Sequence, residues 1–354
     1  MKKIFLSLLA VAALASCTKS EVILDHENEI GFAPSTKNIT KAAMDAGALN
    51  TNEKLGIWAY WDEDGTPINT LNDYTAFNKE YLNDAEFIYK TVTTTERNSV
   101  SSWGGNGIAY PWPIGGSLVF AGYNKPTLAQ SDNYSVSYSL SSDEIVFTNY
   151  KQSNQTAYSF DLCWFNRTSA SYNNRLNGTA VQVTLSHALS WITILVKGEG
   201  LPATAGWKIT NITLNNIAIE GTGTCTGIGQ GKATWSSSTF ATNVEIYKGG
   251  NNPASLTSKY QTLENVQKGT VIIPQVPTTL SVTYEYPVGD SSVPANWVSK
   301  TESVDLKISD TTADNKWLSG THYTYSLIFK GNEILVAPSY GEWTNAADKT
   351  ITVE

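Results

Sequence analysis

The chain of 354 residues carries 24 Lys and Arg against 32 Asp and Glu, a net charge of -8, so its overall charge disfavours binding to nucleic-acid phosphates. With 41% hydrophobic residues it can build real cores, which excludes wholesale disorder. Charged residues make up only 16%, whereas Tyr (18), Trp (11) and Gly (26) are abundant and His (3) is scarce. This composition favours pleated sheets and tight turns and predicts an all-β protein.

The amino terminus predicts export as a lipoprotein. Lys2 and Lys3 precede an apolar run over residues 4–15 that is too short to span a membrane and has the proportions of a secretory signal. The run leads into Ser16-Cys17 and resembles a bacterial lipobox. We therefore predict a signal peptide over residues 1–16, cleavage between Ser16 and Cys17, and acylation of Cys17, including palmitate. The alternative is an ordinary signal with a chance cysteine.

Loss of the signal makes the chain more acidic. It removes two of the 24 basic side chains, so 22 remain against 32 acidic ones and the net charge becomes -10. Because two or more acyl chains anchor a protein stably, we expect an acidic precursor tethered to a membrane by its acyl chains, with no nucleic-acid partner.

Two further cysteines, Cys163 and Cys225, stand in apolar or small-residue company. One disulfide between them and two buried free thiols are both open alternatives. The sequence has no Cys-x-x-Cys motif and no Cys and His spacing typical of zinc sites. We predict no metal site and no cofactor.

Apolar runs bounded by turn residues predict strands throughout the exported chain. In chain order these are 29–33, 55–61, 118–123, 135–140, 144–149, 158–164, 180–186, 190–197, 209–219, 270–273, 279–286, 303–308, 323–330, 333–338 and 350–353. Only 40–49 and 187–191 suit helical turns, and both are too short to be stable alone.

The polar segment 166–178 has no apolar periodicity and predicts a domain boundary at its end. Strands spaced in this way indicate two β-sandwiches in tandem. The predicted domains are therefore a signal peptide (1–16), a tether with the first strand (17–50), an N-terminal β-sandwich (51–178) and a C-terminal β-sandwich (179–354).

The glycine-rich stretch 221–232 suggests a phosphate-binding loop, but the motif is incomplete. Thr226 stands where the first glycine is needed, and Ala233 follows Lys232 in place of Ser or Thr. We interpret the stretch as a flexible loop between strands.

The three histidines do not form a recognisable catalytic motif, because no Gly-x-Ser-x-Gly elbow exposes a nucleophile. We expect His187 to end a strand and bond a backbone group, His26 to lie in the tether and His322 to begin a strand. The sequence therefore predicts a protein that is not an enzyme and has no catalytic residues.

Aromatic residues cluster in one predicted strand. Alternation places Trp58 and Tyr60 on one face and Trp61 on the other. Such side chains either pack in a core or present a stacking platform for sugar rings, and we favour the core.

Several motifs, taken in order, resemble the fimbrillin family of Bacteroidetes, the subunits of type V pili. They are the lipobox, Ile30-Gly31-Phe32, Thr40-Lys41-Ala42, Gly56-Ile57-Trp58-Ala59-Tyr60, Tyr110-Pro111-Trp112-Pro113, Leu118-Val119-Phe120, Asp161-Leu162-Cys163, His187-Ala188-Leu189-Ser190, Ile272-Ile273-Pro274-Gln275 and Trp343.

The resemblance implies two transthyretin-like β-sandwiches, export as an outer-membrane lipoprotein, and proteolytic removal of the first strand, here residues 29–33. It also implies assembly with like or different fimbrial subunits by donor-strand exchange, in which an extended segment of the next subunit fills the vacated groove. Residues 350–353 or 333–336 are the candidate donors.

The predicted maturation site departs from the family pattern. Members cut by an arginine-specific protease carry Arg at the cut, whereas the first Arg of this chain is Arg97. Cleavage between Lys41 and Ala42 therefore requires a lysine-tolerant protease. The equally open alternative is that Lys41 is a solvated linker residue.

The sequence thus predicts a structural or adhesive subunit of a type V fimbria. The alternative is a surface-anchored glycan-binding lipoprotein, and either protein could have a host or glycan ligand.

Replacing the predicted anchor tests the export hypothesis. Cys17→Ala removes the thiol that accepts the diacylglyceryl group, so we expect metabolic labelling with a palmitate analogue to be lost and the chain to leave the membrane fraction. Unchanged labelling and membrane partition would show that Cys17 is not the anchor.

Overall fold

The computed structural model of the chain describes residues 29–34, 53–65, 77–93, 99–125, 134–151, 161–171, 180–200, 206–227, 232–240, 243–250, 253–263, 270–308, 315–330, 333–342 and 351–352. The residues predicted for signal cleavage, acylation and maturation lie outside these ranges: Ser16, Cys17, Lys41 and Ala42.

The described elements are strands apart from one 3-10 turn, η2 (Pro294–Asn296), which confirms the all-β prediction. The strands are β1 (Phe32–Pro34), β2 (Lys54–Asp62), β3 (Lys79–Thr93), β4 (Ser99–Gly105), β5 (Ser117–Lys125), β6 (Ser135–Ser139), β7 (Glu144–Lys151), β8 (Cys163–Ser171), β9 (Val181–Val183), β10 (Ser186–His187), β11 (Ser190–Gly198), β12 (Lys208–Asn215), β13 (Ala218–Thr226), β14 (Lys232–Phe240), β15 (Asn243–Lys248), β16 (Ala254–Ser255), β17 (Gln261–Thr262), β18 (Thr270–Ile272), β19 (Thr279–Pro287), β20 (Trp297–Asp305), β21 (Thr321–Lys330), β22 (Glu333–Glu342) and β23 (Ile351–Thr352). No helix in the described part is long and apolar enough to cross a membrane.

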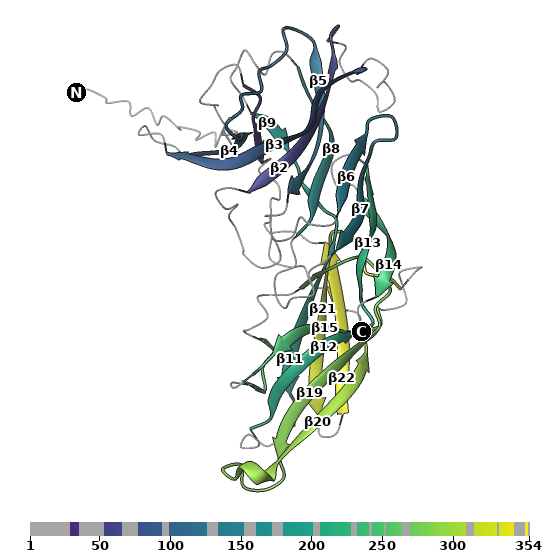
Figure 1. The fold of residues 1–354 in the computed structure, drawn as a ribbon. Helices are drawn as coiled ribbons and strands as arrows, with labels where there is room; N and C mark the ends of the chain where they lie inside the picture. The colour runs from purple at the N-terminus through teal and green to yellow at the C-terminus, as the bar shows by residue number, and fades with distance from the viewer. Residues whose placement is uncertain are drawn as a thin grey trace, which may run out of the picture.

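The strands form four sheets arranged along an elongated molecule (Figure 1). An eight-stranded sheet, in the order β10-β8-β5-β2-β3-β4-β1-β9, occupies one end. A four-stranded sheet, β14-β13-β7-β6, lies along the middle, and the long β19–β20 hairpin reaches the opposite end (Figure 1).

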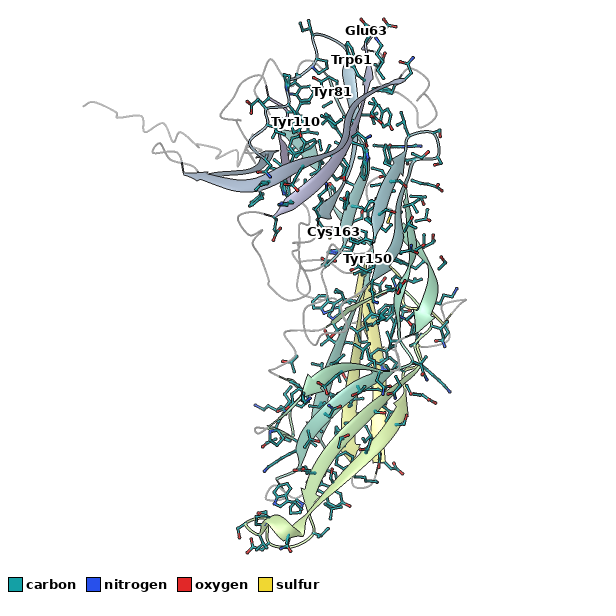
Figure 2. All side chains as sticks on the ribbon, viewed as in Figure 1. Trp61, Glu63, Tyr81, Tyr110, Tyr150 and Cys163 are labelled. Atoms are coloured by element: carbon teal, nitrogen blue, oxygen red, sulfur yellow. The ribbon has the colours of Figure 1, made fainter. Side chains whose placement is uncertain are left out.

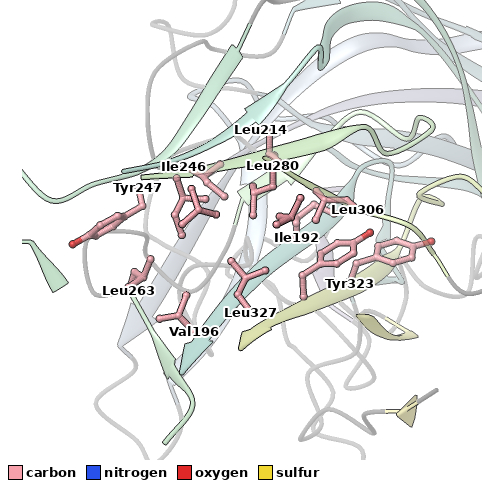
Figure 3. Close-up of a cluster of buried hydrophobic side chains, with 14 of the residues drawn as sticks. Ile192, Val196, Leu214, Ile246, Tyr247, Leu263, Leu280, Leu306, Tyr323 and Leu327 are labelled. Atoms are coloured by element: carbon pink, nitrogen blue, oxygen red, sulfur yellow. The ribbon is translucent and has the colours of Figure 1, made fainter. Parts of the chain in front are cut away.

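The carboxyl-terminal half is a sandwich of the two remaining sheets. One has the path β17-β11-β21-β22-β23 with β18 beside β11, and the other has the path β15-β12-β19-β20 with β16 beside β12. Alternate residues of both sheets point inward and form one core, in which Ile192 and Leu327 of the first sheet meet Leu214 and Leu280 of the second (Figure 3). This alternation is the pattern from which the strands were predicted.

Both faces of the eight-stranded sheet are buried. One face packs on the four-stranded sheet, where Trp58 and Trp164 meet Ile145 and Phe147. The other face supplies a second core with Ile57, and nearly all the buried side chains of that core come from this one sheet. The sheet therefore curves around its own core.

The two halves of the sequence share sheets. Strand β7 precedes the predicted boundary at residue 178, whereas its partner β13 follows it, and the two pair from Glu144↔Thr226 to Lys151↔Glu220. Strands β9 and β10 also follow residue 178, yet both lie in the eight-stranded sheet. The domain boundary at residue 178 and the transthyretin-like topology stay predictions. Strands that precede and follow residue 178 lie together in two of the sheets.

The prediction of a flexible loop over the glycine-rich stretch 221–232 is wrong for residues 221–226, which form a strand; residues 228–231 lie outside the described part of the chain. Residues up to Thr226 belong to β13, and Lys232 begins β14. Gly223 lies directly opposite Trp235, and a Cβ on Gly223 would approach the indole to 2.7 Å. The tryptophan ring covers the glycine, so the cross-strand aromatic supplies the packing that the glycine lacks.

Three other expectations were wrong. Residues 166–171 were placed in a structureless polar segment but form the second half of β8, paired with β5. The helical turn expected at 187–191 is instead the end of β10 and the start of β11. Strands β3, β4, β14, β15, β16 and β17 were not predicted, and the single strand predicted at 209–219 is divided between β12 and the start of β13.

The wrong predictions at β3 and β8 have the same cause. Asp84 in β3 and Arg167 in β8 have positive φ angles, 46° and 52°, and the pairing register shifts beside each. Each is a bulge that interrupts the two-residue alternation on which strand prediction depends.

Adding a methyl group at Gly223 tests the packing of the shared sheet. Gly223→Ala forces the Cβ into the Trp235 indole, so we expect the free energy of unfolding to fall by about 1–3 kcal/mol in urea titrations followed by tryptophan fluorescence. Gly104→Ala is the matched control, because its Cβ meets nothing within 4 Å. Equal stability of the two variants would contradict the packing described.

Candidate assembly site

Strand β1 lies between two other strands. It runs antiparallel to β4, with Phe32 opposite Trp103, and parallel to β9, with Phe32 opposite Val181. The predicted first strand is therefore present and occupies an internal position in the eight-stranded sheet.

The backbone just before β1 is also bound on two sides. Ile30 N–H donates to the Tyr110 carbonyl oxygen at 2.7 Å, and Val181 N–H donates to the Gly31 carbonyl oxygen at 2.8 Å. Glu29 forms an isolated bridge with Pro111. Residues 29–34 thus bind the segment before β5 and strands β4 and β9 at once.

The side chains of this segment lie in the core of the curved sheet. Ile30 is 2% exposed and Phe32 is 0% exposed. The Phe32 ring meets Phe87 and Phe120 edge to face, with centroid distances of 5.0 and 5.1 Å. Burial of a phenylalanine contributes about 1.5–3 kcal/mol, and each aromatic pair adds ~0.5–1.5 kcal/mol.

The arrangement has one geometric consequence. Without residues 29–34, β4 would present an unpaired backbone edge, β9 at the end of the sheet would lose its partner strand β1, and the rings of Phe87 and Phe120 would line the gap. Such a slot fits an extended segment with apolar side chains at alternate positions, because backbone groups pair at both edges while side chains fill the core.

The two candidate donor segments both lie in the carboxyl-terminal sandwich. Residues 333–336 belong to β22, which pairs with β21 along its whole length from Lys330↔Glu333 to Thr321↔Glu342. Ile334 and Val336 pack against the core. Beyond Glu342 the structure describes residues 351–352, which form β23 and pair with β22 at two positions, Tyr340↔Ile351 and Ser339↔Thr352.

The aromatic residues of β2 lie as predicted, on opposite faces. Trp58 is 4% exposed and stacks on Tyr123, and Tyr60 packs against the same core. Trp61, labelled in Figure 2, packs against the other core. The Lys79 ammonium lies 4.9 Å from its ring centroid. Core packing is confirmed for Trp58.

Two histidines lie in the described part of the chain, whereas His26 lies outside it. His187 ends β10, as expected, and its Nδ1 lies 2.9 Å from an Asp161 carboxylate oxygen. His322 Nε2 is 2.9 Å from Thr193 Oγ1 in β11, and its ring stacks on Trp191. His322 lies next to the first residue of β21, close to its predicted place.

Both internal cysteines are buried and free, so the two-thiol alternative holds and they form no disulfide. Cys163 lies beside His187 and Asp161 in the lower part of the eight-stranded sheet (Figure 2). Burial raises the pKa of the Cys163 thiol well above its ordinary value, and the negative charge of Asp161 raises it further. The spacing of these residues gave no sign of this cluster, because strand pairing brings them together.

Comparison with known proteins agrees with this architecture. A family model described as fimbrillin-like matches residues 40–343. Among solved structures, a fimbrial protein from Bacteroides vulgatus has a TM-score of 0.51 and 16% identity, covering 90% of this chain and 100% of the other. A candidate cell adhesion protein from Bacteroides uniformis has a TM-score of 0.51 and 13% identity, with 90% and 98% covered. No curated protein sequence matches the chain.

The two structures share the fold of this chain, an all-β architecture of packed sheets. The family match extends over most of the sequence, from the segment after β1 to the end of β22. The chain therefore belongs to the fimbrillin-like family.

Truncating Phe32 tests how much β1 contributes. Phe32→Ala in the uncut chain removes a fully buried ring and two edge-to-face contacts, so we expect a loss of about 3–5 kcal/mol in the urea transition. Leu335→Ala, at a side chain 45% exposed, is the control and should stay within ~0.5 kcal/mol of the parent. A Phe32→Ala loss as small as the control would mean that β1 is not held as described.

Proposed function

We propose that the chain is a structural or adhesive subunit of a type V fimbria that assembles by donor-strand exchange. It is exported as a lipoprotein anchored through Cys17 at the outer membrane, and it matures by cleavage between Lys41 and Ala42. Family membership supports a fimbrial role. The observation that carries the mechanism is the position of β1 between β4 and β9, with pairing on both sides.

Cleavage changes how tightly β1 is held. Lys41 and Ala42 lie in the sequence between β1 and β2, so a cut there separates residues 29–34 covalently from the rest of the chain. While tethered, the strand has an effective concentration on the order of millimolar at its slot. Once cut, it becomes a short free ligand that a segment of another subunit can displace.

The carboxyl end is the better donor of the two candidates. Releasing residues 333–336 would break a strand paired with β21 along its whole length. Of residues 350–353, the structure describes Ile351 and Thr352, and releasing these two breaks two pairs with β22. In an extended segment Ile351 and Val353 stand two residues apart, as Ile30 and Phe32 do, so both could enter the slot from one face.

The assembly test uses a controlled cut. A recognition sequence for a site-specific protease is inserted between Lys41 and Ala42, and the purified chain is examined by size exclusion and electrophoresis after mild denaturant. We expect the uncut chain to stay monomeric and the cut chain to form ladders, because the slot opens only after cleavage.

A truncated chain ending at Glu342 is the matched control. It keeps the slot but lacks the proposed donor, so alone it should remain monomeric after cutting. Mixed with the full chain, it should enter at one end and shorten the ladders. Ladders of unchanged length from the truncated chain alone would contradict a donor at residues 350–353. A cut full chain that stays monomeric would contradict strand exchange, and binding of that monomer to a glycan array would favour the alternative lipoprotein function.

A further inference from the structure

The cluster of Asp161, Cys163 and His187 is built by strand geometry. Cys163 and His187 are directly opposite each other in the antiparallel β8–β10 pair. Asp161 precedes Cys163 by two residues, so an extended chain places both side chains on the same face. A carboxylate, a thiol and an imidazole therefore converge from two strands that are distant in sequence.

The distances between the three groups match the edges of a metal-centred tetrahedron. Cys163 Sγ is 3.5 Å from Asp161 Oδ2 and 3.5 Å from His187 Nδ1. His187 Nδ1 is 2.9 Å from Asp161 Oδ2. With zinc bond lengths of about 2.3 Å to sulfur and ~2.0–2.1 Å to nitrogen or oxygen, a tetrahedron has edges of about 3.5 Å from sulfur and ~3.3 Å from nitrogen to oxygen. Only the imidazole needs to move, by a few tenths of an ångström.

The cluster is held in place by its surroundings. The Asn124 side chain accepts from Cys163 N–H at 2.7 Å and donates to the Asp161 carbonyl oxygen at 2.6 Å. On the other strand, Ala188 N–H donates to the Leu162 carbonyl oxygen at 2.7 Å. Metal sites depend on such supporting bonds, because they fix the ligands before the ion arrives.

Charge and burial favour a divalent ion over an empty site. Asp161 and Cys163 are each 4% exposed and His187 is 9% exposed. A doubly charged cation bound to one carboxylate and one thiolate leaves no net charge in this buried region, and the thiol proton is released to solvent. Thiolate and imidazole ligands favour zinc-like ions over calcium or magnesium.

We propose that Asp161, Cys163 and His187 bind one divalent transition ion, with Zn²⁺ as the best match to the ligand set. These three groups leave the fourth tetrahedral position to water. The ion would tie the two-residue strand β10 to β8 and so fasten that end of the eight-stranded sheet.

Cobalt titration tests this site, because thiolate coordination to Co²⁺ gives a charge-transfer band. The full chain with Cys17→Ser, which leaves Cys163 and Cys225 as its cysteines, is reduced, freed of metal with a chelator and titrated with Co²⁺. We expect one equivalent to bind with a thiolate band that Zn²⁺ bleaches. Cys163→Ser should abolish the band, whereas Cys225→Ser, at an equally buried thiol, should retain it.

A second measurement guards against misfolded variants. Zn²⁺ should raise the melting temperature of the parent and of Cys225→Ser by a few degrees, while leaving folded Asp161→Asn and Cys163→Ser unshifted. Absence of a thiolate band in the parent, or a band that survives Cys163→Ser, would overturn the proposal. Equal Zn²⁺ shifts in all variants would also overturn it.

Discussion

The contact on which the amino-terminal half depends is the insertion of residues 29–34 between β4 and β9. The Phe32 ring lies edge to face on Phe87 and Phe120, so one side chain connects strands from across the curved sheet. The backbone of the same segment bonds to Tyr110 and Val181 on either side. A segment this short contributes to both the sheet and its core, and its loss would open both.

The position of β1 between β4 and β9 explains why a single cleavage of the chain after β1 would have a large effect on the sheet. An edge strand could leave its sheet with little consequence, whereas a strand paired on both sides leaves two unpaired edges and an apolar gap. In the proposed maturation, the intact chain keeps β1 in its slot by proximity. After the proposed cleavage, affinity alone would decide whether β1 or a segment of a neighbour occupies the slot. The weakly paired β23 at the other end of the chain has the character of such a segment.

Much of the strand pattern could be predicted from the sequence. The same physical reasons explain which strands and contacts could not be predicted. Regular alternation identified β6 and β7 and placed Trp58 and Trp61 on opposite faces, because burial on each face selects alternate residues. Strands with a bulge, such as β3 at Asp84, broke that pattern and were missed. The glycine-rich β13 was misread because its packing comes from Trp235 on the next strand. The pairing of His187 with Cys163 depends on strand register, which no local spacing reveals.

The proposed metal site and the proposed assembly site belong to the same sheet, since β10 and β1 lie near its two ends. The proposed metal ion would hold the short strand β10 in place, whereas the proposed assembly site would release the short strand β1. Release of β1 during assembly can be measured by determining the amino-terminal residue and the intact mass of subunits recovered from surface fibres. We expect a chain that begins at Ala42 and lacks residues 29–34. Fibre subunits that begin at an acylated Cys17 and retain those residues would contradict release of β1.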